Sequence, residues 1–332
     1  MSQIKPLHPS RRQMLSAVVG GIATFASPWS TAQSDHLFTR PVRLIVNFPP
    51  GSSPDVLARA ITQPLQLALS QTVIIENRPG ANGLIGAEAV VKANDGHTFL
   101  VTSGSTISTN PFLYAKMPVD VSRDLVPVAA LARITLFLVV RPELEVRTLT
   151  ELTALMKSRP GKLSYGSAGN GSGMHLAGEL YKSQAGVFAV HVPYRGSAPA
   201  LQDLLGGQID FLFDPGISLS HVRSGRLRLL AVATRKRSLA FSDVPTMEEG
   251  GLPDFDAGTT HGIYAPTGTR PEVVSLLNTT VNRALQIAGV RSQIQSIGAD
   301  PTPLSPEQFQ LQMESDSRRY ARIIKERNIR GD

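Results

Sequence analysis

A turn rich in hydrogen-bond donors follows the first strong strand pattern of the sequence. Residues 42–46 are mostly apolar and β-branched, as in a strand covered on both faces, and the turn itself contributes Pro50, Gly51, Ser52, Ser53 and Asp55. Gly51 lets backbone N–H groups approach a ligand closely, and a helix opening at about Asp55 would direct its partly positive end there. The turn has neither the lysine of a P-loop nor a G-x-G-x-x-G dinucleotide motif. We therefore expect a site for a small anion or, alternatively, an ordinary strand-to-helix turn.

Similar donor-rich segments recur later in the chain. Residues 162–180 read K-L-S-Y-G-S-A-G-N-G-S-G-M-H-L-A-G-E-L, which is typical of a short strand, a glycine-rich turn and a helix. Residues 190–208 repeat this order around V-P-Y-R-G-S, and T-S-G-S-T at 102–106 follows another strand pattern. The motifs E-N-R-P-G-A-N-G at 76–83 and D-F-L-F-D at 210–214 accompany them.

These motifs together resemble the Bug (TctC-like) periplasmic solute receptors of tripartite tricarboxylate transporters. The resemblance runs from about Arg40 to the C-terminus, in the family's order and spacing. It implies a receptor that binds a small carboxylate-bearing solute in a cleft between two lobes and delivers it to the membrane components of such a transporter. We expect a monomer without cofactor or metal. A sensor that presents its liganded state to a signalling protein remains an alternative.

Strand and helix patterns alternate along the chain, which predicts an α/β architecture with largely parallel sheets. Strand patterns occupy residues 42–46, 72–76, 98–102, 136–140, 163–165, 187–192, 211–213, 227–233 and 262–265. Long amphipathic patterns predict terminal helices at 271–288 and 306–325, and capping-box spacing at Thr148, Thr246 and Ser305 marks helix starts.

The family resemblance implies a two-lobed type II periplasmic-binding-protein fold (Venus flytrap), with parallel or mixed sheets flanked by helices. We place lobe 1 at residues 37–138 and 263–332, and lobe 2 at residues 139–262. Loops at the carboxyl ends of the strands would then face the cleft.

In that arrangement the donor-rich turns would meet around the solute. Lobe 1 would supply the turn from Pro50 to Asp55 together with Ser103, Ser105 and Thr106. Lobe 2 would supply Ser167, Ala168, Gly169, Asn170, Gly171, Ser172, His175, Gly196, Ser197 and Asp214. Several N–H bonds to a carboxylate, at about 1.5–3 kcal/mol each, can replace much of its hydration without a cationic side chain.

Some of these polar residues have equally simple structural explanations. Asp55 can cap its helix, and Asp214 before Pro215 can be a turn residue. His175 on a helix face is more often a packed histidine than a ligand contact, and Arg195 can reach solvent as easily as the cleft.

Three positions, in two motifs, depart from the family pattern. Ser52 and Pro54 stand where relatives usually have glycine and threonine, and Pro215 replaces an asparagine. These changes remove an N–H donor, a hydroxyl and an amide, so the solute need not be a typical dicarboxylate.

The N-terminus reads as an export signal. Lys5, Arg11 and Arg12 precede an apolar stretch at 14–26 and a small-residue cleavage site at 30–32, so residues 1–32 would be removed. The segment 10–15 resembles the twin-arginine motif, although general secretion also fits. Removing three basic residues and no acidic one takes the formal charge from +7 to +4.

Composition and motifs argue against several other functions. Cysteine is absent from the 332 residues, which excludes disulfides and thiolate chemistry. The basic residues are scattered without interleaved aromatics, which disfavours nucleic-acid binding. Neither G-x-S-x-G nor H-E-x-x-H occurs, and the one S-x-x-K, at Ser2 to Lys5, lies within the expected export signal. An enzyme would therefore need a site formed only by folding, such as that of a hydrolase.

Overall fold

The computed structural model describes residues 37–238 and 241–331, and within them the chain forms two sheets. The predicted export signal at residues 1–32 lies outside the described residues. The first sheet has the order β11-β4-β10-β3-β1-β2, and its strands are β1 Val42–Val46, β2 Val73–Asn77, β3 Thr98–Thr102, β4 Leu125–Ile134, β10 Thr259–Pro266 and β11 Asp300–Pro301. The second has the order β7-β6-β8-β5-β9, with β5 Phe137–Val140, β6 Ser164–Ser167, β7 Val190–Pro193, β8 Phe211–Asp214 and β9 Arg228–Val232.

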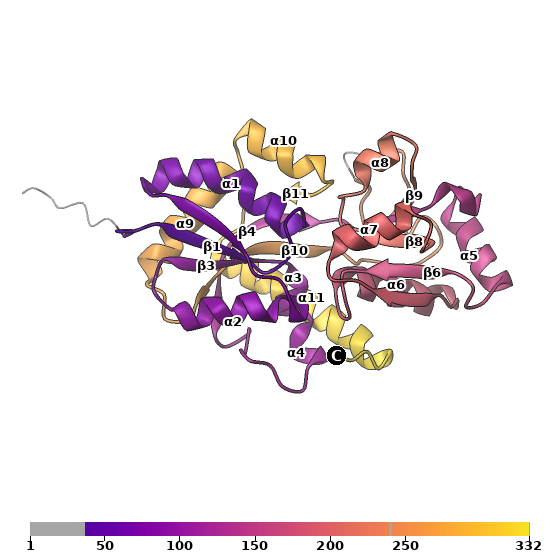
Figure 1. Cartoon of the computed structure of the whole chain (residues 1–332), viewed down its shortest axis with the longest axis horizontal. Coiled ribbons are helices and arrows are strands. Elements are labelled where there is room, and N and C mark those ends of the chain that lie inside the picture. The colour runs from indigo at the N-terminus through magenta and orange to yellow at the C-terminus, as the bar shows by residue number, and fades with distance from the viewer. Residues whose placement is uncertain (1–36, 239–240, 332) are drawn as a thin grey trace, which may run out of the picture. The chain divides into compact units, whose positions relative to one another are not determined.

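Helices pack against both sheets (Figure 1). Those around the first sheet are α1 Ser53–Leu69, α2 Leu84–Ala93, α3 Gly104–Ser108, α4 Asn110–Leu113, α9 Pro271–Ala284, α10 Ala288–Ser296 and α11 Pro306–Glu326. Those of the second are α5 Leu149–Ser158, α6 Gly173–Ala185, α7 Ser197–Leu205 and α8 Leu219–Arg223. Short 3-10 turns occupy Ala81–Gly83 and Pro142–Leu144.

The chain crosses between the sheets twice. It leaves the first sheet after β4 and enters the second at β5, so only residues 135 and 136 lie between them. It returns before β10, whose Thr259 pairs with Ile134. The first crossing, at residues 135 and 136, lies near the boundary at 138/139 that we expected, and the return precedes Thr259, near the expected boundary at 262/263. The division into two mobile lobes stays a prediction.

Each sheet combines parallel and antiparallel pairs. In the first sheet β1 runs parallel to β2 and β3, while β10 is antiparallel to β3 and β4. In the second, β6 is parallel to β7 and β8, while β5 is antiparallel to β8 and β9. In sheets of this kind, ligands usually bind at the loops that follow the carboxyl ends of parallel strands, which here are the loops after β1, β3, β6 and β8.

Each of the nine expected strands is present, with ends that shift by a few residues. The sequence did not predict β4, because its alanines and Pro127 have low strand propensity. Pro127 is tolerated because it pairs with Tyr264 beside a register shift and has no partner in β11, which pairs only with residues 132 and 133.

Two helix expectations need correction. The single helix expected at 271–288 is two, since α9 ends at Ala284 and α10 begins at Ala288. At Thr246 the reciprocal hydrogen bonds with Glu249 do form, but only turns follow, because Gly251 has a φ of +100°. At Thr148 and Ser305 the capping side chains do precede helices.

Helix α11 connects elements of both sheets. It packs against β4 and α3, and its C-terminal half contacts α6 (Figure 1). The last contact is apolar, because Tyr320, Ile323 and Ile324 form one cluster with Leu113 and Leu176. The C-terminal helix thus touches the second sheet's helices while belonging to the first.

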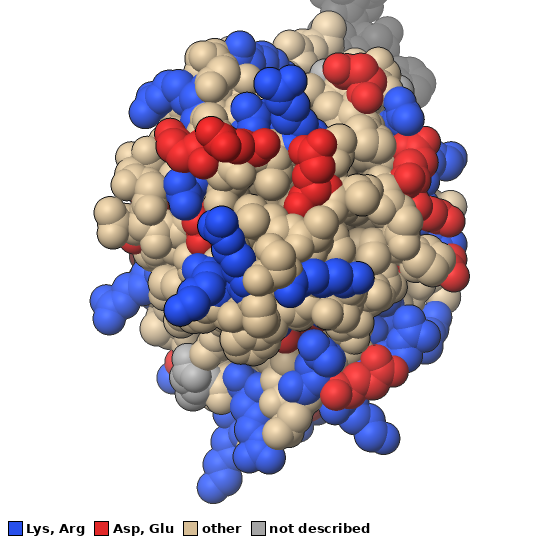
Figure 2. All heavy atoms as spheres, turned by 90° about the vertical axis from the view of Figure 1, so that its right-hand side faces the viewer, with Lys and Arg blue, Asp and Glu red and all other residues tan. Residues whose placement is uncertain are grey.

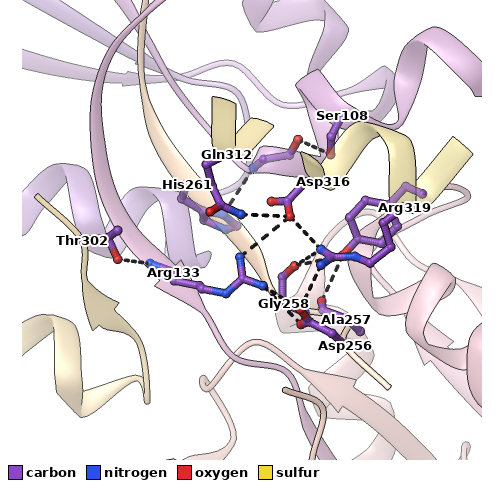
Figure 3. Close-up of polar contacts among 12 residues, drawn as sticks. Ser108, Arg133, Asp256, Ala257, Gly258, His261, Thr302, Gln312, Asp316 and Arg319 are labelled. Carbon is purple, nitrogen blue, oxygen red and sulfur yellow. Dashed lines mark hydrogen bonds and ion pairs between the residues drawn. The ribbon is translucent and has the colours of Figure 1, made fainter. Parts of the chain in front are cut away.

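A buried ionic cluster lies where the chain crosses (Figure 3). Arg133 of β4 and Arg319 of α11 bind the Asp256 carboxylate at 3.1 and 2.9 Å, and Arg319 also binds Asp316 at 2.9 Å. The Tyr320 hydroxyl donates to the Ala257 carbonyl at 3.1 Å. These bonds fix the connection that leads into β10.

Candidate ligand-binding site

A cavity of about 50 Å³ is lined by residues that follow strands of both sheets. Phe48 follows β1, Ser103 follows β3, Ala168 follows β6 and Pro215 follows β8. Small-molecule pockets usually measure about 300–1,000 Å³, so the cavity in this structure is smaller than a typical ligand pocket.

The cavity wall combines hydroxyl groups with apolar surface. The hydroxyls belong to Ser52, Ser53, Ser103, Ser105, Ser172, Ser197 and Thr259, and all seven residues are buried. The remaining lining residues are Phe48, Pro54, Ile134, Leu136, Ala168, Gly173, Met174, Pro215 and His261. None of these described residues is a lysine, arginine, aspartate or glutamate, so any anion here meets neutral donors.

Four helices begin at the cavity. Ser52, Ser103 and Ser172 are the N-cap residues of α1, α3 and α6, and α7 starts at Ser197. A helix N-terminus presents unpaired N–H groups and a partial positive charge of about +0.5. Because α1 and α3 belong to the first sheet's side and α6 and α7 to the second's, donors face the cavity from both.

His261 of β10 is a polar lining residue that our sequence reasoning missed, as is Thr259. The His261 Nε2 lies 3.0 Å from the Ser53 hydroxyl, and its Nδ1 accepts from the Gly104 N–H at 3.3 Å. Burial lowers the pKa of His261 to about 3, so the ring is neutral near pH 7. Residue 261 lies just before the expected strand at 262–265, and no donor-rich turn after a strand marked it.

Comparison with known proteins identifies the family. The sequence profile of the tripartite tricarboxylate transporter family receptor, TctC, matches residues 57–329. BugT of Bordetella pertussis is 39 % identical over 316 residues, which cover 94 % of this chain and 97 % of BugT. The chain belongs to the TctC receptor family. The resemblance inferred from the sequence motifs is confirmed.

Solved receptor structures agree with the fold. Rpa4515 of R. palustris, solved with adipate, has a TM-score of 0.85 at 36 % identity, covering 88 % of this chain and 98 % of that one. MatC of Rhodopseudomonas palustris, solved with bound malate, has a TM-score of 0.81 at 31 % identity, covering 86 % and 99 %. The expected periplasmic-binding-protein fold is confirmed, and these relatives are solute-binding receptors.

The structure of the receptor brings seven of the predicted site residues to the cavity. These are Ser52, Ser53, Ser103, Ser105, Ala168, Ser172 and Ser197. Their contact with a solute stays a prediction. The other predicted residues, which do not line the cavity, are Pro50, Gly51, Asp55, Thr106, Ser167, Gly169, Asn170, Gly171, His175, Gly196 and Asp214.

The Asp55 carboxylate is hydrogen-bonded to neighbouring residues of the protein. Its carboxylate accepts from the Gly51 N–H at 3.0 Å, from Arg59 at 2.9 Å and from Asn77 at 2.9 Å. Burial alone would raise the pKa of Asp55, but these bonds outweigh it and the pKa lies below its usual value. The structural explanation therefore accounts for this residue.

Ser52 also satisfies the turn, because its hydroxyl donates to the Pro49 carbonyl at 2.6 Å. Pro54 lies in the first turn of α1, where a missing N–H costs nothing. The departures from the family pattern at these positions are thus compatible with the helix start.

The His175 side chain hydrogen-bonds to the backbone of the glycine-rich turn. Its Nδ1 accepts from the Gly171 N–H at 3.0 Å, and its ring stacks on His191 with centroids 3.9 Å apart. His191 in turn lies 2.7 Å from the Ser167 hydroxyl, and burial together with His175 lowers the pKa of His191 to about 3. The side chains of Ser167 and His175, at the two ends of this turn, thus both have hydrogen-bond partners within the protein.

The remaining candidates have internal or solvent partners. Thr106 donates to the Asn82 carbonyl at 3.2 Å, and Arg195 is exposed.

Figure 2 shows basic and acidic side chains interspersed over the end of the molecule that carries α5 and α6. No group of acidic or histidine side chains suited to a metal ion occurs among the described residues, and no helix of the described part is long and apolar enough to cross a membrane.

Asp214 is a fully buried turn residue. Its Oδ2 accepts from the N–H groups of Gly216 and Ser218, at 2.7 and 2.9 Å, and from the Ser218 hydroxyl at 2.8 Å. Burial raises the pKa of Asp214 to about 6, against the hydrogen bonds, which lower it. Its neighbour Pro215, rather than Asp214, lines the cavity.

This pKa makes stability depend on pH. A carboxyl whose pKa is raised on folding stabilises the protein fully below the unfolded value, and this contribution is lost as the pH rises through the folded value of about 6. Asp214→Asn removes the titration, so between pH 4.5 and 7.5 its unfolding free energy should gain about 2 kcal/mol relative to the unsubstituted protein. Urea denaturation at the two pH values measures this, and a pH-independent difference would contradict it.

Proposed function

We propose that this receptor binds a small carboxylate-bearing solute in the cavity and delivers it to the membrane components of a tripartite tricarboxylate transporter. The observation that carries the proposal is the convergence of the N-termini of α1, α6 and α7, from both sheets, on a buried cavity without charged side chains. At α3 the N–H groups of Gly104 and Ser105 are already paired, so Ser103 and Ser105 contribute hydroxyl groups there. Such a cavity offers an anion several hydrogen bonds and no repulsive carboxylate. The relatives solved with adipate and malate support the same class of solute.

Hydrogen bonds alone bring this arrangement into the range of a receptor. Bonds to a charged group contribute about 1.5–3 kcal/mol each, so three or four of them sum to about 4.5–12 kcal/mol, a range that includes the roughly 8 kcal/mol of micromolar binding before ordering costs are subtracted. The apolar wall, with Phe48, Met174 and Pro215, suits a carbon body between or behind the carboxylates. A cation is repelled by the helix termini and finds no counter-charge among the lining residues.

A panel of acids tests this proposal. Adipate, malate, citrate, glutamate and benzoate are added to the purified protein in a thermal-shift screen, and ligand released from freshly purified protein is identified by mass spectrometry. At one hundred times its dissociation constant a bound acid stabilises by about 2.7 kcal/mol, which raises the melting temperature by several degrees. The monomethyl ester of the acid that binds should lose most of the affinity. Stabilisation by amines or sugars, and by none of the acids, would contradict the proposal.

Ser172 offers a substitution that separates binding from folding. It is the N-cap of α6, and its hydroxyl accepts from the His175 N–H. Aspartate is also a good N-cap and favours the helix dipole by about 0.3–1 kcal/mol, so Ser172→Asp should fold normally. Its charge would repel a carboxylate in a water-excluding cavity, and affinity measured by calorimetric titration should fall at least tenfold.

Thr148 provides the matched control. It caps α5 in the same way, with its hydroxyl accepting from the Glu151 N–H, but does not line the cavity. Thr148→Asp should leave the affinity unchanged. Equal affinities of the two aspartate variants would move the solute site elsewhere.

We also propose that the receptor is exported and processed after Ala32, so that it functions in the periplasm. The basic start, the apolar stretch and the small residues at 30–32 support this route. N-terminal sequencing of the exported protein should begin at Gln33, and an intact Met1 on the exported product would contradict it.

A further inference from the structure

The hydrogen bonds of His261 determine which of its nitrogens carries the proton. The ring is 3 % exposed, and each nitrogen has one partner. A backbone N–H can only donate, so the Gly104 N–H requires Nδ1 to be the acceptor. In the neutral ring the proton then lies on Nε2, which donates to the Ser53 oxygen 3.0 Å away.

This bond leaves Ser53 with one direction for its own proton. The Ser53 oxygen accepts from His261 with one of its two lone pairs, so its proton points away from the ring, and no other described residue hydrogen-bonds with this hydroxyl. Ser53 is the first residue of α1 and lines the cavity. Its O–H can therefore donate only to what the cavity contains.

The surrounding backbone holds the histidine in this role. Ser108, labelled in Figure 3, donates to the Gly104 carbonyl at 2.8 Å, and β10 fixes His261 opposite Ala132. A Cβ on Gly104 would meet the Thr259 hydroxyl oxygen at 2.2 Å and the Thr260 carbonyl oxygen at 2.5 Å. Only glycine lets β10 come close enough for the Gly104 N–H to reach the ring.

We propose that His261 is a positioning residue: by donating to the Ser53 oxygen, it directs the Ser53 O–H to donate a hydrogen bond to the solute's carboxylate. This end of the cavity thereby favours hydrogen-bond acceptors over hydrogen-bond donors. The inference rests on the proposed function, since it names the role of one bond in the same site. If the ring carried its proton on Nδ1, two donors, the Nδ1–H and the Gly104 N–H, would point at each other. The Nε2 of the ring would then accept the Ser53 proton, and the anion would lose that donor.

The ring itself gives the first test. Long-range ¹H–¹⁵N spectra of the ligand-free mature protein report the tautomer of each histidine, and the His261 signals are assigned by their loss in His261→Gln. We expect the Nε2–H tautomer, without titration between pH 5.5 and 8. An Nδ1–H tautomer, or protonation within that range, overturns the proposal.

Binding by paired variants gives the second test, with adipate or malate as the probe, whichever binds the unsubstituted protein more tightly. Ser53→Ala should lower affinity at least tenfold. His261→Asn, whose oxygen can replace Nδ1 but whose amide falls short of Ser53, should lower it about fivefold. His261→Gln places an amide N–H near the position of Nε2 and should stay within about threefold.

The double variant decides between positioning and packing. If His261 acts through Ser53, then adding His261→Asn to Ser53→Ala should cost little further affinity, since the coupled loss has already occurred. Additive losses, or full binding by His261→Asn beside weakened Ser53→Ala, overturn the proposal. His221→Asn, on α8 and away from the cavity, is the control and should bind normally. Failure of the unsubstituted protein to bind any acid would instead overturn the proposed function.

Discussion

The buried cluster of Arg133, Asp256, Asp316 and Arg319 is the constraint on which the site depends. Two positive and two negative side chains neutralise one another there, and the Asp316 side chain has no exposed surface. The side chains of Arg133, Asp256 and Arg319 are partly exposed, at 28, 12 and 21 %, so removing one member should cost less than the about 3–5 kcal/mol typical of a fully buried pair. The cluster joins β4, the connection into β10 and α11, so it fixes the strand that carries Thr259 and His261 to the cavity.

In the proposed function, the cavity would bind an anion without the help of a cationic side chain. A lysine or arginine would gain Coulomb energy but would first have to be stripped of water in a closed space. Helix N-termini need no such step, because their N–H groups are unpaired within the helix and already directed. Ser52 and Asp55 show the structural side of the same arrangement, since they satisfy the turn at the start of α1 and leave the following donors free.

The sequence predicted most of the architecture and six of the seven hydroxyl-bearing residues of the cavity wall. The turns at Ser53, Ser103, Ser172 and Ser197 were recognisable because glycine, serine and proline mark helix starts after strands. Thr259 and His261 were not, because they lie just before the expected strand at 262–265 and reach the cavity only through the pairing of β10 with β4. Asp214 is the opposite case: a polar residue after a strand looks like a ligand contact, and its three internal hydrogen bonds fit the turn residue that the sequence also allowed.

The origin of the donors also bears on how this receptor can diverge. A backbone N–H belongs to every residue except proline, so the anion-binding end of the cavity persists through most single substitutions of the side chains around it. The apolar wall at Phe48, Met174 and Pro215 has no such protection, and each replacement there changes the volume and shape offered to the carbon body of the solute. The backbone donors that would contact the charged group are thus kept as long as the fold is kept, while the apolar wall that limits the size of the solute can change with each substitution. If the proposed function holds, substitutions of the apolar wall would change which acid is bound while leaving the N–H donors in place.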